Sequence, residues 1–327
     1  MSAPIKTIAV MTSGGDAPGM NAAIRAVVRT AKYHKLNVMG VMRGYEGLIK
    51  GDFVPMNSAS VRNIIHRGGT ILKSARSDQF RTEEGRKAAY EQVKAYDIDA
   101  LITIGGNGTF TGANLFSKEF GFPVIGIPGT IDNDLHGTDH TIGYDTAVNT
   151  AIEAVDKIRD TADSHDRLFF IEVMGRDAGF IALSTGIGSG AGTVLLPETH
   201  TDIEEVIEQL DRGAKRKKLF NLVIVAEGNQ NGGAVEMAKR VEAKFQQYET
   251  KVAIIGHIQR GGSPTAMDRL LASRLGYAAV EALVEGKHGV MIGVHNNSIS
   301  HTPIEDAITI DKPLNHRLLE LAYVLAL

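Results

Sequence analysis

Short apolar runs alternate with amphipathic stretches along nearly the whole chain. The runs end in glycine-rich or polar segments, which is typical of buried strands followed by turns. We predict strands at Ile5–Met11, Asn37–Met42, Asp99–Ile104, Val124–Ile127, Leu168–Met174, Thr193–Leu196, Leu222–Ala226, Val252–Ile255 and Val290–Val294. Helical spacing of apolar residues predicts helices between them, notably after Gly19, at Ile203–Lys218 and at Met267–Glu285. This alternation indicates the α/β fold class, with parallel sheets covered by helices on both faces.

Composition narrows the class of protein. The chain has 327 residues, enough for two domains, and is 43% hydrophobic and 22% charged, as globular proteins are. Its net charge of −3 gives no reason to expect nucleic acid or a membrane surface as a main partner. Without cysteine, disulfides and thiolate metal sites are excluded. No signal-peptide core or membrane-spanning run is evident, so we expect a cytoplasmic enzyme.

The segment Pro128–Asp134 carries the most suggestive chemistry. It follows the apolar run Val124–Ile127, and strand ends are where open α/β sheets bind ligands. Asp132 and Asp134 lie two residues apart, near the hydroxyl of Thr130. In a phosphoryl transfer, one carboxylate could take the proton from an attacking hydroxyl while the other holds or orients a metal. An Asx-rich turn whose side chains cap backbone groups explains the motif equally well.

Two strand-to-loop junctions are unusually rich in glycine. Gly14 and Gly15 follow the first predicted strand, and Gly106 and Gly108 follow the third; a further loop is predicted at Arg43–Gly47. Glycines let a backbone approach a phosphate, and free N–H groups at the next helix start bind its charge. Glycine also serves ordinary tight turns, and neither junction matches a P-loop or a dinucleotide fingerprint. A nucleotide site built from two separate loops is therefore favoured over either standard motif.

Arginines recur at the predicted strand ends. Arg167 precedes a predicted strand, Arg176 and Arg260 follow strands, and Arg76 follows the glycine-containing loop Arg67–Thr70. A single arginine is usually solvated, whereas several at strand ends favour an anionic ligand, because the guanidinium fork matches phosphate. His257 near Arg260 suits a sugar phosphate and Glu227 suits sugar hydroxyls, although both are also ordinary residues at such positions.

Six motifs together resemble those of the bacterial 6-phosphofructokinase family. They are Thr12–Asn21, Gly68–Arg76, Gly105–Thr109, Pro128–Asp134, Met174–Arg176 and Gly256–Ser263. The similarity extends over nearly the whole chain, and the motifs are specific in combination. It implies a glycolytic kinase that uses ATP and Mg²⁺ to phosphorylate the 1-hydroxyl of fructose 6-phosphate.

The resemblance also implies a role for each motif. ATP is expected at Gly15, Tyr45, Arg76, Ser77, Gly106, Asn107, Gly108 and Thr109. The implied catalytic set is Asp132 as the base, with Thr130, Asp134, Arg76 and Arg176. The sugar phosphate is expected at Thr130, Ile131, Asp132, Arg167, Met174, Gly175, Arg176, Glu227, Lys251, His257, Ile258, Gln259 and Arg260. Asn107 and Asp132 are the implied metal residues.

The architecture implied by the resemblance is a pair of α/β domains with the active site in the cleft between them. The larger, ATP-binding domain is expected at 1–141 plus 255–305 and the smaller, sugar-phosphate-binding domain at 142–254 plus 306–327. The family works as a homotetramer, and Arg167 is expected to reach the sugar site of a neighbouring subunit. ADP and phosphoenolpyruvate are the implied effectors, at Arg25, Arg29, Ser58, Arg159, Gly192 and Lys218.

The chain departs from the family pattern at several positions. Asn107 stands where a metal-associated aspartate is usual, and an amide oxygen is still acceptable to Mg²⁺. Lys251 replaces an arginine, which keeps the charge but loses the fork. Ser58 replaces an arginine of the effector site, and Gly192 replaces a glutamate that meets the effector's metal. We therefore expect a weak or altered effector response.

Two other functions remain as alternatives. A pyrophosphate-dependent relative, or a more distant NAD or lipid kinase, shares a similar glycine loop. The full set of sugar-side motifs argues against the distant kinases. A sugar-phosphate- or nucleotide-binding regulator that has lost activity through Asn107 is the non-catalytic alternative, and Asp132, Asp134, Arg76 and Arg176 argue against it.

Overall fold

The computed structural model describes residues 5–163, 167–199, 203–215, 221–245 and 247–326. Contacts divide the chain into two compact units, each made of segments far apart in the sequence. The first unit comprises Met1–Ile131, Leu135–Asp145 and Arg260–Lys312, and the second comprises Asp132–Asp134, Thr146–Gln259 and Pro313–Leu327. Apart from the short segment Asp132–Asp134, the boundaries between the units therefore follow Asp145, Gln259 and Lys312. The boundaries expected from the sequence followed residues 141, 254 and 305.

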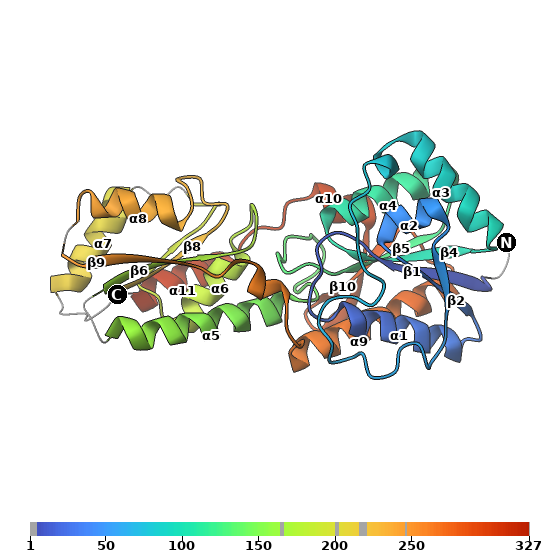
Figure 1. The fold of residues 1–327 in the computed structure, drawn as a ribbon, viewed down its shortest axis with the longest axis horizontal. Helices are drawn as coiled ribbons and strands as arrows, with labels where there is room; N and C mark the ends of the chain where they lie inside the picture. Colours follow the sequence, from blue (N-terminus) through green and yellow to red (C-terminus); the bar gives the residue numbers. More distant parts are fainter. Residues whose placement is uncertain (1–4, 164–166, 200–202, 216–220, 246, 327) are drawn as a thin grey trace. The chain divides into compact units, whose positions relative to one another are not determined.

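The first unit is built on a seven-stranded sheet with the order β11-β10-β5-β4-β1-β2-β3. Its strands are β1 (Thr7–Thr12), β2 (Asn37–Val41), β3 (Phe53–Met56), β4 (Ala100–Gly105), β5 (Val124–Pro128), β10 (Val290–His295) and β11 (Ser298–Pro303). Figure 1 shows one face covered by α1 (Met20–Tyr33) and α9 (Ala266–Val284), and the other by α2 (Gly44–Lys50), α3 (Glu83–Ala95), α4 (Asn107–Phe120) and α10 (Ile304–Thr309). Because helices cover both faces, β4 and β5 are buried along their whole length.

The second unit contains a four-stranded parallel sheet with the order β7-β8-β6-β9. Its strands are β6 (Arg167–Val173), β7 (Thr193–Leu195), β8 (Asn221–Ala226) and β9 (Glu249–Ile254). In Figure 1, α8 (Ala234–Glu242) and α7 (Ile203–Lys215) lie on one face, and α5 (Tyr144–Asp163), α6 (Phe180–Ser189) and α11 (His316–Ala326) on the other. The core includes Leu168, Phe170, Val223, Val225 and Met237, so β6 and β8 supply its centre.

The α/β class with parallel-based sheets and helices on both faces is confirmed, and two edge strands that the sequence did not predict run antiparallel. The strands β3 and β11 pair antiparallel with β2 and β10. Both lack the apolar run that marks a buried strand, since β3 contains Pro55 and β11 reads SISHTP. The predicted loop at Arg43–Gly47 is also wrong, because Gly44–Lys50 forms α2. A Cβ on Gly47 would overlap the Met42 carbonyl, so this glycine permits a close backbone approach within a helix.

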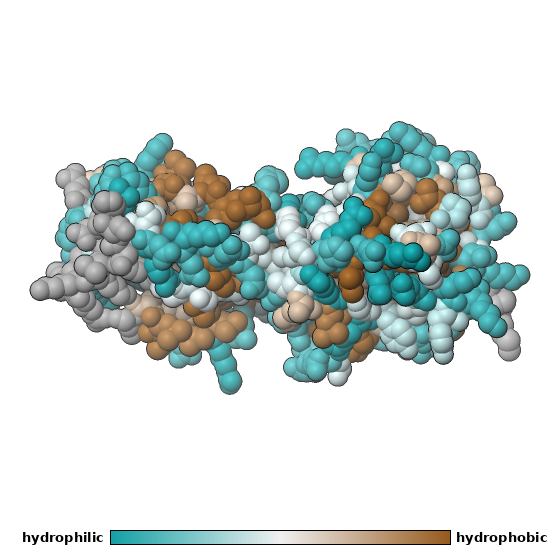
Figure 2. Space-filling model, turned by 60° about the horizontal axis from the view of Figure 1, so that its bottom comes forward, coloured by the Kyte–Doolittle hydropathy of each residue, from teal (hydrophilic) through white to brown (hydrophobic). Residues whose placement is uncertain are grey.

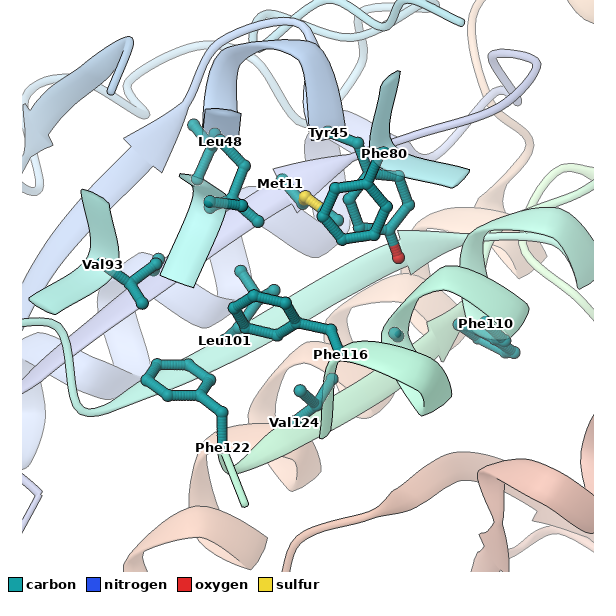
Figure 3. Close-up of a cluster of buried hydrophobic side chains, with 14 of the residues drawn as sticks. Met11, Tyr45, Leu48, Phe80, Val93, Leu101, Phe110, Phe116, Phe122 and Val124 are labelled. Carbon is teal, nitrogen blue, oxygen red and sulfur yellow. The ribbon is translucent and has the colours of Figure 1, made fainter. Parts of the chain in front are cut away.

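Aromatic side chains fill the core on the α2–α4 face of the first unit. The rings of Tyr45 and Phe80 are stacked with their centroids 3.9 Å apart, and Phe116 follows at 6.0 Å from Phe80. Figure 3 shows the Tyr45 and Phe80 rings face to face beside Met11. Phe80 belongs to the short 3-10 helix η1 (Gln79–Arg81), so this stack ties η1 to α2.

Large apolar side chains also reach the surface. Leu270 and Tyr277 of α9 are 63% and 55% exposed, and Leu325 of α11 is 61% exposed. Figure 2 shows such apolar patches between hydrophilic regions on the visible face of the molecule. Within the described residues, no helix combines the length and the apolar character needed to cross a membrane.

Candidate active site

The ends of β1 and β4 bring the two glycine-rich segments together in the first unit. Ser13 N donates to the Ile104 carbonyl over 3.0 Å, which ties the two strand ends. A Cβ on Gly14 would lie 3.4 Å from Thr109 Oγ1, and one on Gly105 would lie 2.6 Å from Ser13 O. The segments predicted as halves of a nucleotide site are therefore adjacent.

The first turn of α4 consists of Asn107, Gly108 and Thr109. Gly106 precedes it as the N-cap residue and has no side chain of its own with which to cap the helix. Gly108 is exposed, and a Cβ added there would meet nothing within 4 Å. Amides at a helix start attract anions, so this turn presents a surface that suits phosphate groups.

Arg260 lies against the first glycine segment. Its NH1 donates to the Asp16 carbonyl over 3.4 Å, and a Cβ on Gly15 would overlap its guanidinium group. A side chain at position 15 would thus displace Arg260. The absence of a side chain at Gly15 allows a cation to lie next to the loop before α1.

Thr130 lies beside the same segments, and a side chain fixes its carbonyl. A Cβ on Gly106 would lie 3.3 Å from Thr130 Cβ, and the Thr130 carbonyl accepts a 2.6 Å hydrogen bond from Thr141 Oγ1. Ile131 is fully buried and ends this part of the first unit. The chain then enters the second unit at Asp132.

Tyr45 and Ser77 face inward. Tyr45 is 6% exposed, and its hydroxyl donates to the Thr109 carbonyl; burial raises the pKa of this phenol above its usual value. Ser77 Oγ donates to Glu46 Oε2 over 3.0 Å and accepts from Phe80 N over 3.4 Å. Both side chains therefore support the start of α4 and η1 from within the unit.

Arg76 follows a loop that is held to α1 by the side chain of Asn21. Sequence reasoning missed this role of Asn21. The buried Asn21 carboxamide donates to the Arg67 and Gly68 carbonyls, both over 3.1 Å, and accepts from Ile71 N over 2.8 Å. A usable signal exists, since Asn21 falls on the apolar stripe of its helix, and a polar residue there needs internal partners. Arg76 itself is exposed and bonds to no other residue in the described part of the chain.

In the second unit, the candidate base lies beside an arginine. The Asp132 side chain is 4% exposed, and its Oδ2 is 3.6 Å from Arg176 Nε. The guanidinium of Arg176 is 61% exposed, so it can reach a ligand while facing the buried carboxylate. Asp134 belongs to the same short segment and is partly buried. A carboxylate that accepts a proton next to a cation that neutralises charge is an arrangement that serves phosphoryl transfer.

Two polar side chains hold the turn that carries Arg176. Glu227 Oε1 accepts from Gly175 N over 3.2 Å and from Arg176 N over 2.8 Å. The Gln259 side chain, predicted to meet the sugar, is fully buried and accepts from Met174 N over 2.9 Å. Glu227 is exposed as a residue and so retains access to a ligand, whereas Gln259 does not.

Arg167 and Lys251 share one carboxylate. Arg167 Nε lies 2.9 Å from Glu249 Oε2, and Lys251 Nζ lies 2.5 Å from Glu249 Oε1. The hydrogen bond from Lys251 and then the one from Arg167 lower the pKa of Glu249. These cations were predicted to bind the phosphate of the sugar, and both are paired here with Glu249, which sequence reasoning missed. His257 and Ile258 lie nearby in the sequence and are exposed.

The expected effector residues are distributed over both units. Arg25 and Arg29 lie on one face of α1, and burial, then repulsion by Arg29, lowers the pKa of Arg25. Ser58 is exposed in the same unit. Arg159 lies on α5 of the second unit. In the same unit, Gly192 N donates to the Leu222 carbonyl over 3.0 Å. Lys218 lies outside the described residues.

The donor set fits a magnesium ion that arrives with a nucleotide. No group of three or more His, Cys, Asp or Glu side chains within the described residues could hold a metal alone. Mg²⁺ keeps several waters and takes one or two carboxylates together with substrate phosphates. The predicted metal residues offer such oxygens, a carboxylate at Asp132 in the second unit and a neutral amide at Asn107 in the first.

Residues 7–283 match the profile of the family described as Phosphofructokinase. The chain is 56% identical over 323 residues to the ATP-dependent 6-phosphofructokinase 1 of Thermus thermophilus, covering 99% of this chain and 100% of the relative. It is 54% identical over 318 residues to the ATP-dependent 6-phosphofructokinase of Cytophaga hutchinsonii, covering 97% of each. The chain therefore belongs to the phosphofructokinase family.

Solved structures agree with this assignment. Phosphofructokinase from Saccharomyces cerevisiae matches with a TM-score of 0.90 at 37% identity over 98% of this chain, which spans about half (48%) of the yeast chain. The pyrophosphate-dependent phosphofructokinase from Marinobacter aquaeolei matches with a TM-score of 0.83 at 26% identity, covering 96% of this chain and 86% of that chain. Both support the same two-domain α/β fold.

Proposed function

We propose that this protein is an ATP-dependent 6-phosphofructokinase, which transfers the γ-phosphoryl group of ATP to the 1-hydroxyl of fructose 6-phosphate. The observation that carries the proposal is the buried Asp132 carboxylate 3.6 Å from Arg176 Nε. It occurs in a chain 56% identical to a relative named for this activity.

Asp132 acts as the general base. It takes the proton of the 1-hydroxyl as the oxygen attacks the γ-phosphorus, and the bond from that phosphorus to the leaving ADP oxygen breaks. Arg176 neutralises charge on the transferred group, and Arg76 does so from the first unit. Thr130 and Asp134 orient the reacting groups. Glu227, His257 and the cations Arg167, Lys251 and Arg260 bind the sugar and its phosphate.

ATP is the donor because the start of α4 has room for a nucleotide. Position 108 is open, so the glycine leaves the helix start accessible to a large anion. Pyrophosphate-using relatives are expected to carry an aspartate at this position and a lysine at position 129. A Cβ on Gly129 would lie 2.9 Å from Ile104 Cγ2, so a larger side chain there requires local repacking.

Magnesium would be held by Asp132 and Asn107 together with the nucleotide phosphates. When bound, the ion neutralises phosphate charge. The chain contributes one carboxylate and one amide to it, so the requirement for Mg²⁺ is expected at a somewhat higher concentration than in relatives with an aspartate at position 107.

We further propose a cytoplasmic homotetramer in which Arg167 and Lys251 serve a neighbouring subunit's sugar site. The exposed apolar residues of β9, Val252 at 39% and Ile254 at 58%, support burial of this edge strand against another subunit. ADP and phosphoenolpyruvate are the proposed effectors, bound in part by Arg25 and Arg29. Sedimentation of the purified protein tests the assembly.

A turnover assay tests the activity. Purified protein with Mg²⁺ and fructose 6-phosphate is given ATP or pyrophosphate in parallel, and formation of fructose 1,6-bisphosphate is measured. Turnover with ATP alone is expected. Turnover with pyrophosphate alone would reassign the donor, and no turnover with either would favour the non-catalytic alternative.

A further inference from the structure

The buried carboxamide of Gln259 links two elements of the second unit. Its Oε1 accepts from Met174 N over 2.9 Å, and its Nε2 donates to the Ala147 carbonyl on α5 over 3.5 Å. The residue is 0% exposed. A side chain enclosed in this way does not touch a ligand, so its effect must pass through the residues that it holds.

The turn that it holds has an unfavourable backbone. Gly175 has φ +146°, and Arg176 has φ +52°, in the left-handed region that costs a non-glycine residue about 1–2 kcal/mol. Such a conformation persists only where surrounding contacts determine it. Here all three N–H groups of Met174–Arg176 are bound by side chains, one by Gln259 and two by Glu227.

The backbone of this turn sets the direction of the Arg176 side chain toward Asp132. We propose that Gln259 is a positioning residue, which fixes the Met174–Arg176 turn so that the guanidinium stays beside the base. The inference rests on the proposed function of this pair. It changes the expected role of Gln259 from a sugar contact to an internal support.

The contribution of Gln259 can be tested apart from that of Glu227, because only the exposed Glu227 can contact a ligand. Gln259→Met removes both hydrogen bonds while nearly keeping the volume. We expect a roughly 10- to 100-fold loss of kcat, because misplacing one charged group by about 1 Å costs rate on that scale. The KM for ATP, whose expected residues lie mainly in the first unit, should change less than twofold.

The matched control is Gln209→Met. Gln209 is a partly buried glutamine of the same unit, and its Oε1 accepts from Thr193 Oγ1 over 2.9 Å. This variant undergoes the same chemical change away from the turn, so kcat should stay at the wild-type value. An equal loss of kcat in both variants would overturn the inference, since it would reflect general destabilisation.

A double-mutant cycle distinguishes positioning from a merely structural role. If Gln259 acts through the guanidinium, Gln259→Met should lower kcat little further in an Arg176→Ala background. Full additivity would overturn the inference. Wild-type turnover is measured first, so inactivity of the wild type would refute the proposed function, whereas an active wild type with an unaffected Gln259→Met variant would refute only the positioning role.

Gln259→Glu provides a second readout if Gln259→Met does not fold. A buried carboxyl has a raised pKa, and its protonated form can accept from Met174 N and donate to the Ala147 carbonyl as glutamine does. Its kcat relative to wild type should therefore increase as the pH falls from 8 toward 6. A pH-independent ratio equal to one would contradict the positioning role.

Discussion

Arg86 joins the segment after Arg76 to α4 through a buried ion pair, and its removal should affect both stability and the use of ATP. Its side chain is 9% exposed, and Nε and NH2 contact the two carboxylate oxygens of Glu119 at 2.7 and 2.6 Å. The NH1 group donates to the Phe80 carbonyl over 3.2 Å and to the Arg81 carbonyl over 2.7 Å. The hydrogen bonds to Glu119 raise the pKa of the guanidinium, so it remains charged.

Arg86→Met keeps the aliphatic stem and removes all four hydrogen bonds. Breaking a buried pair costs about 3–5 kcal/mol, and the lower end applies because the Glu119 side chain is 27% exposed and can be hydrated. A loss of about 3 kcal/mol predicts a fall in Tm of about 6–12 °C for the transition of the first unit. Lys118→Met is the control, since it breaks an ion pair with Glu305 whose side chains are 55% and 57% exposed.

Arg86→Met should also weaken the binding of ATP. The reason is that the two carbonyls to which Arg86 donates, those of Phe80 and Arg81, belong to η1. The Phe80 ring of η1 stacks on Tyr45, whose hydroxyl donates to the Thr109 carbonyl in the first turn of α4 (Figure 3). Loosening η1 should raise the KM for ATP several-fold at 25 °C, with little change in the KM for fructose 6-phosphate. Thermal melts and steady-state kinetics of Arg86→Met and Lys118→Met decide this. Equal Tm values and equal KM values for ATP would refute the reasoning.

Three further predictions concern the base, the cations expected to bind the sugar phosphate, and the residue expected to meet the metal. Asp132→Ser should lower kcat by about 10²–10⁴ while binding of fructose 6-phosphate, measured by calorimetry, is retained; near-wild-type kcat would reassign the base. Glu249→Ala should lower the half-saturating concentration of fructose 6-phosphate a few-fold, because Arg167 and Lys251 would lose a carboxylate that pairs with both; an unchanged value would show that Glu249 does not compete. Asn107→Asp should lower the Mg²⁺ concentration for half-maximal rate, and an unchanged titration would remove this position from the metal site.

Sequence patterns predicted the elements that are buried on both faces. Strands such as β4 and β5 are continuous apolar runs that end in glycine or proline, and that pattern is local. The antiparallel edge strands β3 and β11 carry no such pattern, because half of the residues in each are exposed and an apolar run is not needed there. Local sequence therefore predicted the centre of each sheet better than its edges.

Residue types at the candidate site were predictable, but their surroundings were not. The carboxylates of Asp132 and Asp134 and the arginines at strand ends follow from position and resemblance. The burial of Tyr45 and Gln259 depends on partners 64 and 85 residues away in the chain. A pattern over a few residues contains no information about such partners, so it cannot distinguish a side chain that meets a ligand from one that supports its neighbour.

The division of the chain at Asp132 bears on how the reaction is organised. Thr130 and the glycine segments belong to the first unit, whereas Asp132, the turn with Arg176, Glu227 and Gln259 all belong to the second. The base, the turn with Arg176 and Glu227 are thus parts of one packed body with its own core, whereas Arg260, also expected at the sugar phosphate, belongs to the first unit. The contact between Asp132 and Arg176 lies within the second unit, although Asp132 is joined to the first unit on both sides, through Ile131 and Leu135. It follows that the turn beside the base is organised by contacts internal to the second unit, such as those of Gln259 and Glu227.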